Sequence, residues 1–156
     1  KIPVATVEEL KTIHTLCITG GEPFIASINL NDFARSVKDG FPNVKNIFVY
    51  TSGVMLLYNL PQVFSYIDGL SICPKSIKDW LALEKIANST SHYYLNNISK
   101  LSSNRLYVFK EQVELFEGRF KHIAELLNLN VLCRTWDKEF KTPENEIFRR
   151  LPILLN

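Results

Sequence analysis

In Leu16-Cys17-Ile18-Thr19-Gly20-Gly21-Glu22-Pro23, an apolar strand runs directly into a turn of two glycines, a carboxylate and a proline. Adjacent glycines accept backbone angles that other residues avoid, and they let the backbone approach a ligand closely. Proline then restricts the exit from the turn. Glu22 is the one ionised group at this strand end, and a carboxylate held there suits a ligand ammonium group. An ordinary strand-to-helix turn would have the same pattern.

The composition is that of one globular domain. A chain of 156 residues can bury a substantial core. Its hydrophobic fraction of 46% and charged fraction of 22% are typical of soluble globular proteins. The net charge of +2 gives no reason to expect nucleic acid or a membrane surface as a partner. No apolar run approaches the roughly 20 residues that span a bilayer.

Cysteine usage indicates a reducing compartment. Cys17, Cys73 and Cys133 are an odd number of widely spaced cysteines, which argues against a disulfide framework. We expect all three to be buried as small hydrophobic residues of strands. The first residues, Lys1-Ile2-Pro3-Val4, lack the apolar core of a signal peptide. We therefore predict a cytoplasmic protein.

Strand-like runs alternate with helical patterns along the chain. The predicted strands are 14–19, 46–51, 68–73, 105–110 and 130–136. Their centres are almost continuously apolar, as in strands buried on both faces of a sheet. The alternation predicts an α/β fold with a parallel sheet and right-handed crossovers. We expect a single domain over residues 1–156, with residues 143–156 as a C-terminal helical tail.

Capping residues mark where the helices begin. Thr6 and Glu9 form a capping box ahead of a short helix. Asn31 and Ser76 are candidate N-caps of two further helices. Residues 112–129 have apolar side chains at helical spacing, which predicts an amphipathic helix.

Polar groups follow several strands, and parallel strands bring such ends to one rim of the sheet. The second strand ends in Tyr50-Thr51-Ser52-Gly53, the third in Ser71-Ile72-Cys73-Pro74-Lys75 and the fifth in Arg134-Thr135-Trp136-Asp137. With Glu22, they would line the rim with a carboxylate, hydroxyls, cations and an aromatic ring. That set suits a zwitterionic ligand with hydroxyl groups. Each position taken alone could equally be a turn residue or a solvated side chain.

Other chemistries have little support in the sequence. His14, His92 and His122 share no metal-ligand spacing. The chain has no Walker A loop, no dinucleotide-binding glycine motif and no nucleophile elbow. Cys73 beside Lys75 could be an activated thiolate, but no base partner is evident.

The turn Gly20-Gly21-Glu22-Pro23 resembles the motif that ends the second strand in the radical S-adenosylmethionine (SAM) superfamily. The resemblance implies a partial parallel (β/α) barrel, also called a partial TIM barrel, that lacks its first strand here. Thr51-Ser52-Gly53 is similar to a family turn, and Ser71 stands where members carry a serine that contacts the cofactor. The implied cofactor-binding residues are Gly20, Gly21, Glu22, Pro23, Thr51, Ser52, Ser71 and Lys75. Lys75 and Arg134 would face a substrate or cofactor carboxylate.

Within the superfamily, the chain looks most like 7-carboxy-7-deazaguanine synthases. Those enzymes pair a Glu-Thr-Ser/Asn-Gly turn with a Ser-Pro-Lys segment. Tyr50 replaces the glutamate here, and Cys73 replaces the serine. Ribonucleotide-reductase activases and peptide-modifying members are the other subtypes that fit.

The superfamily also binds a 4Fe–4S cluster through a Cys-x-x-x-Cys-x-x-Cys loop, which this chain lacks. The resemblance implies that the cluster loop and the first strand lie upstream of Lys1, and that a flavodoxin or ferredoxin supplies electrons. The complete enzyme would cleave SAM to a 5′-deoxyadenosyl radical and abstract hydrogen from a substrate that the sequence does not identify. We expect this chain alone to be inactive, because cluster and cofactor carry that chemistry.

Two alternatives remain open. A chain complete as written would be a cluster-free degenerate module that binds a nucleoside-like ligand or a protein partner. An unrelated flavodoxin-like domain could instead hold a phosphate at Thr19-Gly20-Gly21, although Glu22 would repel it.

Overall fold

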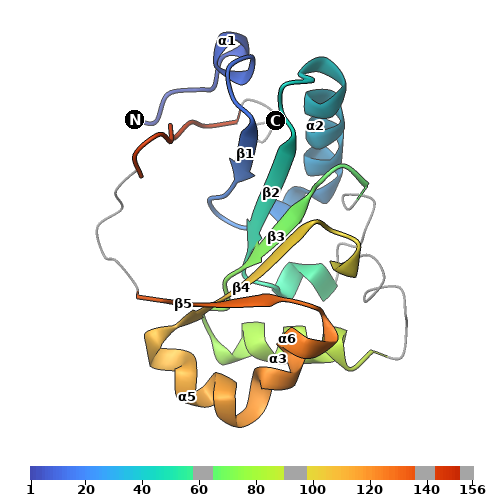
Figure 1. The fold of residues 1–156 in the computed structure, drawn as a ribbon, viewed down its shortest axis with the longest axis vertical. Coiled ribbons are helices and arrows are strands. Elements are labelled where there is room, and N and C mark those ends of the chain that lie inside the picture. The colour runs from blue at the N-terminus through green and yellow to red at the C-terminus, as the bar shows by residue number, and fades with distance from the viewer. Residues whose placement is uncertain (58–64, 90–97, 136–142, 152–156) are drawn as a thin grey trace.

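A parallel sheet forms the centre of the computed structural model, which describes residues 1–57, 65–89, 98–135 and 143–151. Its five strands pair in the order β1-β2-β3-β4-β5, all parallel (Figure 1). They are β1 (Thr15–Ile18), β2 (Asn46–Thr51), β3 (Gly69–Ile72), β4 (Ser103–Phe109) and β5 (Asn130–Arg134). The predicted α/β fold with a parallel sheet is confirmed. The strand order is compatible with a partial (β/α) barrel.

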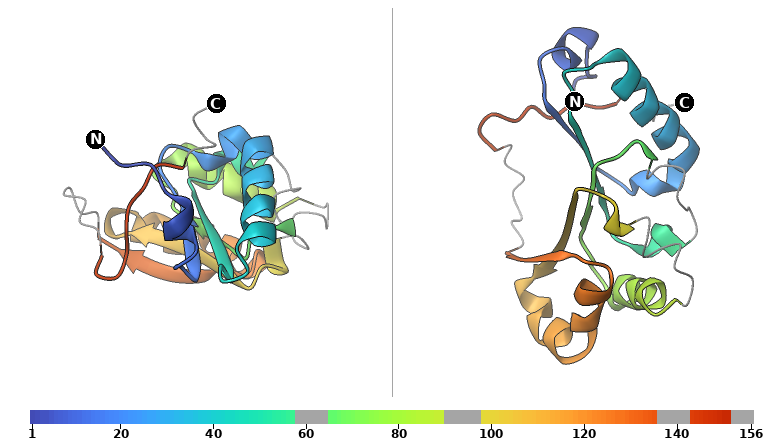
Figure 2. Two further views of the ribbon diagram at one scale, coloured as in Figure 1. Left: turned by 90° about the horizontal axis from the view of Figure 1, so that it is seen from above. Right: turned by 45° about the vertical axis from the view of Figure 1, so that its right-hand side comes forward.

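The helices lie on one face of the sheet. The longer ones are α2 (Ser27–Gly40), α3 (Ile77–Ala87) and α6 (Lys121–Leu126). Because each strand pairs with the next one in sequence, connections of one hand all return on the same side. Figure 2 shows these helices outside the curved sheet, with residues 143–151 on its other side. We call that other side the inner face.

Because helices cover one face, burial alternates along β2, whereas all four residues of β3 are buried. In β2 the residues that point toward the helices are buried, namely Ile47, Val49 and Thr51, and those between them are half-buried. The expectation of strands buried on both faces is therefore wrong for β2. Phe48 and Tyr50 made the run look continuously apolar, but their positions alternate with the buried ones and so belong to the inner face.

The predicted helix starts are confirmed at two of three places. Capping boxes begin α1 (Val7–Leu10) at Thr6 and α3 at Ser76. The prediction of an N-cap at Asn31 is wrong, because α2 already begins at Ser27, directly after the 3-10 turn Pro23–Ala26. Proline suits the first turn of a helix, so helical structure starts just beyond the glycine turn.

The predicted helix over 112–129 is present but changes its winding. It runs through a 3-10 turn (Lys110–Gln112), α5 (Val113–Leu115), a π-helical turn (Phe116–Phe120) and α6. The rings of Phe116 and Phe120 lie 5.7 Å and 5.5 Å from Trp80 of α3, centroid to centroid. Both rings, four residues apart, therefore pack on the same partner. No helix in the described ranges is long and apolar enough to cross a membrane.

The expected C-terminal helix is not formed over residues 143–151. That segment makes a turn and then an extended stretch, in which Arg150 pairs with Val4 in a parallel bridge. Arg149 contacts the Glu9 carboxylate at 2.8 Å, and this hydrogen bond lowers the pKa of Glu9. Pairing with the distant N-terminal segment replaces the local hydrogen bonds of a helix. Residues 152–156 of that prediction lie outside the described ranges.

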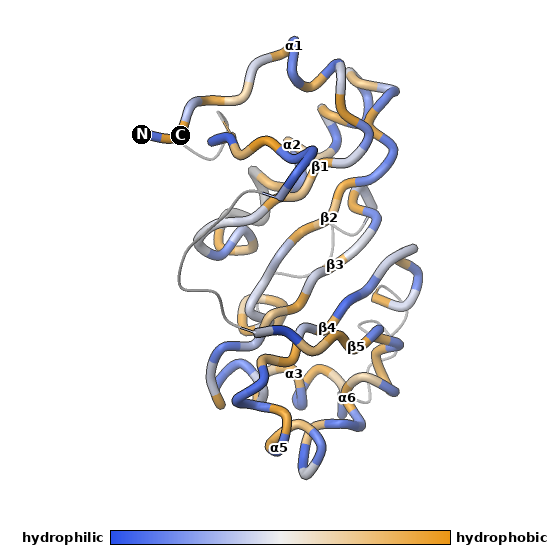
Figure 3. Tube along the Cα trace, turned by 60° about the vertical axis from the view of Figure 1, so that its left-hand side comes forward, coloured by the Kyte–Doolittle hydropathy of each residue, from blue (hydrophilic) through white to orange (hydrophobic). Residues whose placement is uncertain are grey.

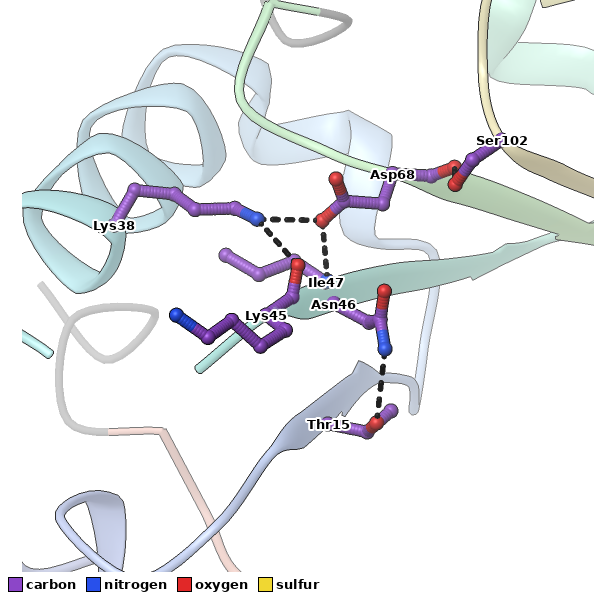
Figure 4. Close-up of polar contacts among 7 residues, drawn as sticks. All are labelled: Thr15, Lys38, Lys45, Asn46, Ile47, Asp68 and Ser102. Carbon is purple, nitrogen blue, oxygen red and sulfur yellow. Dashed lines mark hydrogen bonds and ion pairs between the residues drawn. The ribbon is translucent and has the colours of Figure 1, made fainter. Parts of the chain in front are cut away.

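A partly buried ion pair joins the amino ends of β2 and β3 to α2 (Figure 4). The Asp68 carboxylate accepts hydrogen bonds from Lys38 Nζ at 2.7 Å and from the Ile47 amide at 2.8 Å. Lys38 Nζ also donates to the Lys45 carbonyl at 2.8 Å. Both charged side chains are about one-quarter exposed, at 26% and 27%. This contact joins α2 to the starts of β2 and β3, at the rim opposite the glycine turn.

Replacing Asp68 should therefore destabilise the fold. In Asp68→Ala, Lys38 and the Ile47 amide lose their acceptor, and we expect a loss of about 2 kcal/mol in the free energy of unfolding by urea. Asp32→Ala is the matched control, because the Asp32–Arg35 pair is more than half exposed. We expect that control to change stability by ~0.5 kcal/mol or less. Equal losses in both variants would contradict the role given to Asp68.

Candidate functional site

Glu22 joins the carboxyl ends of β1 and β2. One carboxylate oxygen accepts hydrogen bonds from Thr51 Oγ1 at 2.8 Å and the Phe24 amide at 3.3 Å. The other accepts from the Ser52 amide and Ser52 Oγ, both at 3.0 Å. The two turns that the sequence placed on one rim are in direct contact. A carboxylate has about four acceptor positions, so a ligand ammonium group would have to share them or contact backbone carbonyls of the turn.

The glycine turn faces open space. Gly20 and Gly21 have φ of +84° and +56°, in the left-handed region that favours glycine. A Cβ atom at either position would meet no atom within 4 Å. Pro23, the last residue of the turn, is buried. A ligand could thus lie directly against this backbone.

Gly53 has a different reason to be glycine. Its φ is +105°, and a Cβ atom there would lie 2.8 Å from the Leu83 side chain. Packing against α3 therefore requires glycine at position 53. This explains part of the motif without a ligand.

A second polar cluster surrounds Cys73, just after β3. Arg134 and Lys75 both act on this thiol electrostatically, which places the ends of β3 and β5 close together. Burial nevertheless raises the pKa of Cys73 to about 11, which outweighs the lowering by the two cations. The thiol is neutral at physiological pH, so the geometry does not favour an activated thiolate.

Ser71 lies short of the rim. Strand register places it level with Tyr50 and Arg105, on the inner face. The residue is fully buried, and Ser71 Oγ has no hydrogen-bond partner within the described part of the chain. A buried hydroxyl without a partner is uncommon and calls for an explanation such as a missing ligand or water.

The sequence reasoning named Arg134 but missed the rest of a layer of rings and guanidinium groups on the inner face. Tyr50 and Tyr107 stack with centroids 6.3 Å apart, Arg105 lies 5.1 Å from the Phe48 ring, and Arg134 lies 4.9 Å from the Tyr107 ring. Burial, together with Tyr107 and Cys17, raises the pKa of Tyr50 to about 12. The alternation of these residues along β2 and β4 was the available signal. Their aromatic character made them read as core.

The described residues contain no group of three histidine, cysteine, aspartate or glutamate side chains that could hold a metal. Cys17 and Cys133 are exposed, contrary to expectation, because they lie on the two edge strands. Cys73 follows the middle strand. Three thiols on separate strands do not fit a 4Fe–4S cluster, which needs ligands grouped around it. His14 and His122 have surface contacts, and His92 lies outside the described ranges.

Comparisons with known proteins found no matching family model, no similar curated protein and no similar solved structure. The functional argument therefore depends on the site alone.

The raised pKa of Cys73 can be measured by alkylation. We expect the rate of reaction with iodoacetamide, followed by peptide mass spectrometry, to rise with an apparent pKa near 11 in the native protein. In urea the same thiol should titrate near 8.5, the ordinary value. A folded pKa above the unfolded one means that stability declines as the pH rises through this interval.

Cys73→Ser supplies the control for that pH dependence. The variant should lose less stability than the wild type between about pH 8.5 and pH 11, because one raised thiol has been removed. A native alkylation profile centred near 8.5 would contradict the burial argument.

Proposed function

We propose that the chain is the SAM-binding portion of a radical SAM enzyme and that the cofactor binds at the carboxyl rim of the sheet. The observation that carries this proposal is the contact of Glu22 with Thr51 and Ser52. This contact joins the two turns whose sequences resemble motifs of the superfamily. The left-handed Gly20 and Gly21 beside it have open space in front of them, as a backbone cradle for a ligand requires.

The residues present fit the chemical groups of this cofactor. The Gly20-Gly21-Glu22 turn offers carbonyl and carboxylate oxygens to the methionine ammonium group. Ser52 offers a hydroxyl to the ribose or the carboxylate, and the unpartnered Ser71 hydroxyl lies two register positions deeper in the sheet. Lys75 and Arg134 bring positive charge to the same rim, where a carboxylate would need it.

Bound SAM supplies a sulfonium group, whose reductive cleavage would provide a radical for hydrogen abstraction from a substrate. A 7-carboxy-7-deazaguanine synthase-like reaction is the subtype with the greatest likeness in motifs. Because the three cysteines do not fit a 4Fe–4S cluster, we assign no step of that cleavage to this chain. Its residues bind and orient the cofactor, and the ligands of a cluster would have to come from elsewhere.

A second candidate function follows from the hydrogen bonds that already occupy the Glu22 carboxylate. Its carboxylate already accepts four hydrogen bonds within the protein, so its purpose could be to join β1 to β2. The chain would then be a cluster-free module that binds a nucleoside-like ligand through the rim hydroxyls. This candidate predicts that the amino-acid part of SAM contributes nothing to binding.

Calorimetric titration with SAM tests the proposal. We expect saturable binding with a Kd below about 1 mM, and at least a tenfold weaker Kd in Glu22→Gln. The substitution removes the negative charge of the carboxylate. It also turns an amide NH2 group, itself a donor, toward hydrogen-bond donors that have a carboxylate oxygen as their acceptor in the wild type. Glu125→Gln is the matched control, because this exposed glutamate lies on α6. It should bind SAM as the wild type does.

Competition with adenosine separates the two candidates. Under the proposal, adenosine should displace SAM at least tenfold less effectively, because it lacks the ammonium and carboxylate groups. Equal competition by adenosine, with no effect of Glu22→Gln, would favour the nucleoside-binding module. If neither compound binds the folded chain, both functions are rejected.

A further inference from the structure

Two guanidinium groups on the inner face have aromatic partners but no carboxylate partner among the described residues. Arg105 lies over the Phe48 ring at 5.1 Å, and its Nη1 atom donates to the Tyr107 hydroxyl at 3.4 Å. Arg134 lies over the ring of the same tyrosine at 4.9 Å. Neither arginine takes part in any ion pair within the described ranges.

Another arginine on the molecule is a useful comparison. Arg119 also lies over an aromatic ring, that of Phe120, at 4.8 Å. Arg119, however, has a carboxylate partner, Glu84, at 3.5 Å. The two inner-face arginines differ from Arg119 in lacking a carboxylate partner among the described residues.

The rings limit how these two groups are presented. A guanidinium group held over a ring keeps N–H donors for other partners, such as the oxygens of a carboxylate or phosphate. Arg105 is half-buried, and both groups contact Tyr107. Two positive charges that converge without a counter-ion repel each other, so an anion between them would lower the electrostatic energy.

The surroundings leave the position of the counter-ion open. Burial and then the carboxylate of Glu146 raise the pKa of Cys17, whereas Arg105 lowers it, so Glu146 approaches this face near β1. Glu146 is exposed and forms no ion pair with Arg105. The buried Ser71 hydroxyl, level with Arg105 in the strand register, also lacks a partner. Cationic donors and an unsatisfied hydroxyl thus occur on the same face.

We propose that Arg105, Arg134 and the Tyr107 hydroxyl form an oxyanion site on the inner face of the sheet. The site takes a phosphate or carboxylate group, which accepts hydrogen bonds from both guanidinium edges and from the tyrosine. The trace in Figure 3 shows β5 as hydrophilic at its two ends and hydrophobic between them, and the one charged residue of this strand, Arg134, is at its carboxyl end. That the ligand is a substrate rests on the proposed function; that it is an oxyanion does not.

NMR of the arginine side chains tests the site in the full chain. The Nε–H signals are followed during titration with inorganic phosphate and, separately, with acetate, at an ionic strength held constant with sodium chloride. We expect saturable shifts for Arg105 and Arg134 with half-saturation below about 10 mM. The Arg119 signal should not saturate, because Glu84 already occupies that guanidinium group.

Matched variants check the assignment. Arg105→Gln should weaken phosphate binding at least fivefold at the Arg134 signal, whereas Arg119→Gln should leave it unchanged. Shifts that grow linearly and equally for all three arginines would mean charge screening and would overturn the proposal. Saturation by phosphate at the lower concentration identifies a phosphoryl ligand, and saturation by acetate at the lower concentration identifies a carboxylate.

Arg134 belongs to both proposed sites, but the outcomes of this test and of the test with SAM can be distinguished. A chain that binds phosphate at Arg105 but fails to bind SAM keeps the oxyanion site and loses the proposed function. A chain that binds SAM but shows no saturable phosphate or acetate shift loses only the oxyanion site. The wild-type titration needs no substitution, so a variant that fails to fold cannot conceal the outcome.

Discussion

The neighbour-to-neighbour order of the parallel strands determines where every other group lies. Since β1 to β5 pair in sequence order, their helices return on one side and cover only that face. All carboxyl ends then meet at one rim, where Glu22 reaches Thr51 and Ser52. Among the described residues no helix covers the inner face, and arginines and tyrosines of the strands lie there beside Leu132. Both proposed sites are consequences of this order.

The carboxylates at the two rims of the sheet, Asp68 and Glu22, have different surroundings. At the amino rim, Asp68 is paired with Lys38 and so has its charge compensated within the protein. At the carboxyl rim, Glu22 is held by hydroxyl and amide donors and has no cation beside it among the described ion pairs. A carboxylate that keeps its net charge can still attract a ligand cation. This difference in charge compensation, and not the number of hydrogen bonds, distinguishes the stabilising carboxylate, Asp68, from the candidate binding carboxylate, Glu22.

Features that depend on residues close together in the sequence were easier to predict than contacts between distant segments. The bounds of β2 and the caps at Thr6 and Ser76 could be predicted, because each depends on residues within a few positions. The C-terminal helix was predicted wrongly, since residues 143–151 pair with the N-terminal segment instead. The rim site was foreseen from strand ends, but the inner-face layer was not. Apart from Arg134, which the sequence placed at the rim, the members of this layer read as buried strand residues until their alternation could be related to a single covered face.

The sequence by itself determined the succession of strands and helices and the two glycine turns, because local backbone preferences and apolar spacing act within short segments. Only the tertiary structure decided that Glu22 is saturated by Thr51 and Ser52, and that Arg105 meets Phe48 and Tyr107 without a carboxylate. The contacts of Glu22, and that of Arg105 with Phe48, join segments far apart in the chain and depend on register, whereas Arg105 and Tyr107 lie two residues apart on β4. Register follows from how the sheet packs against its helices, and no single strand contains that information.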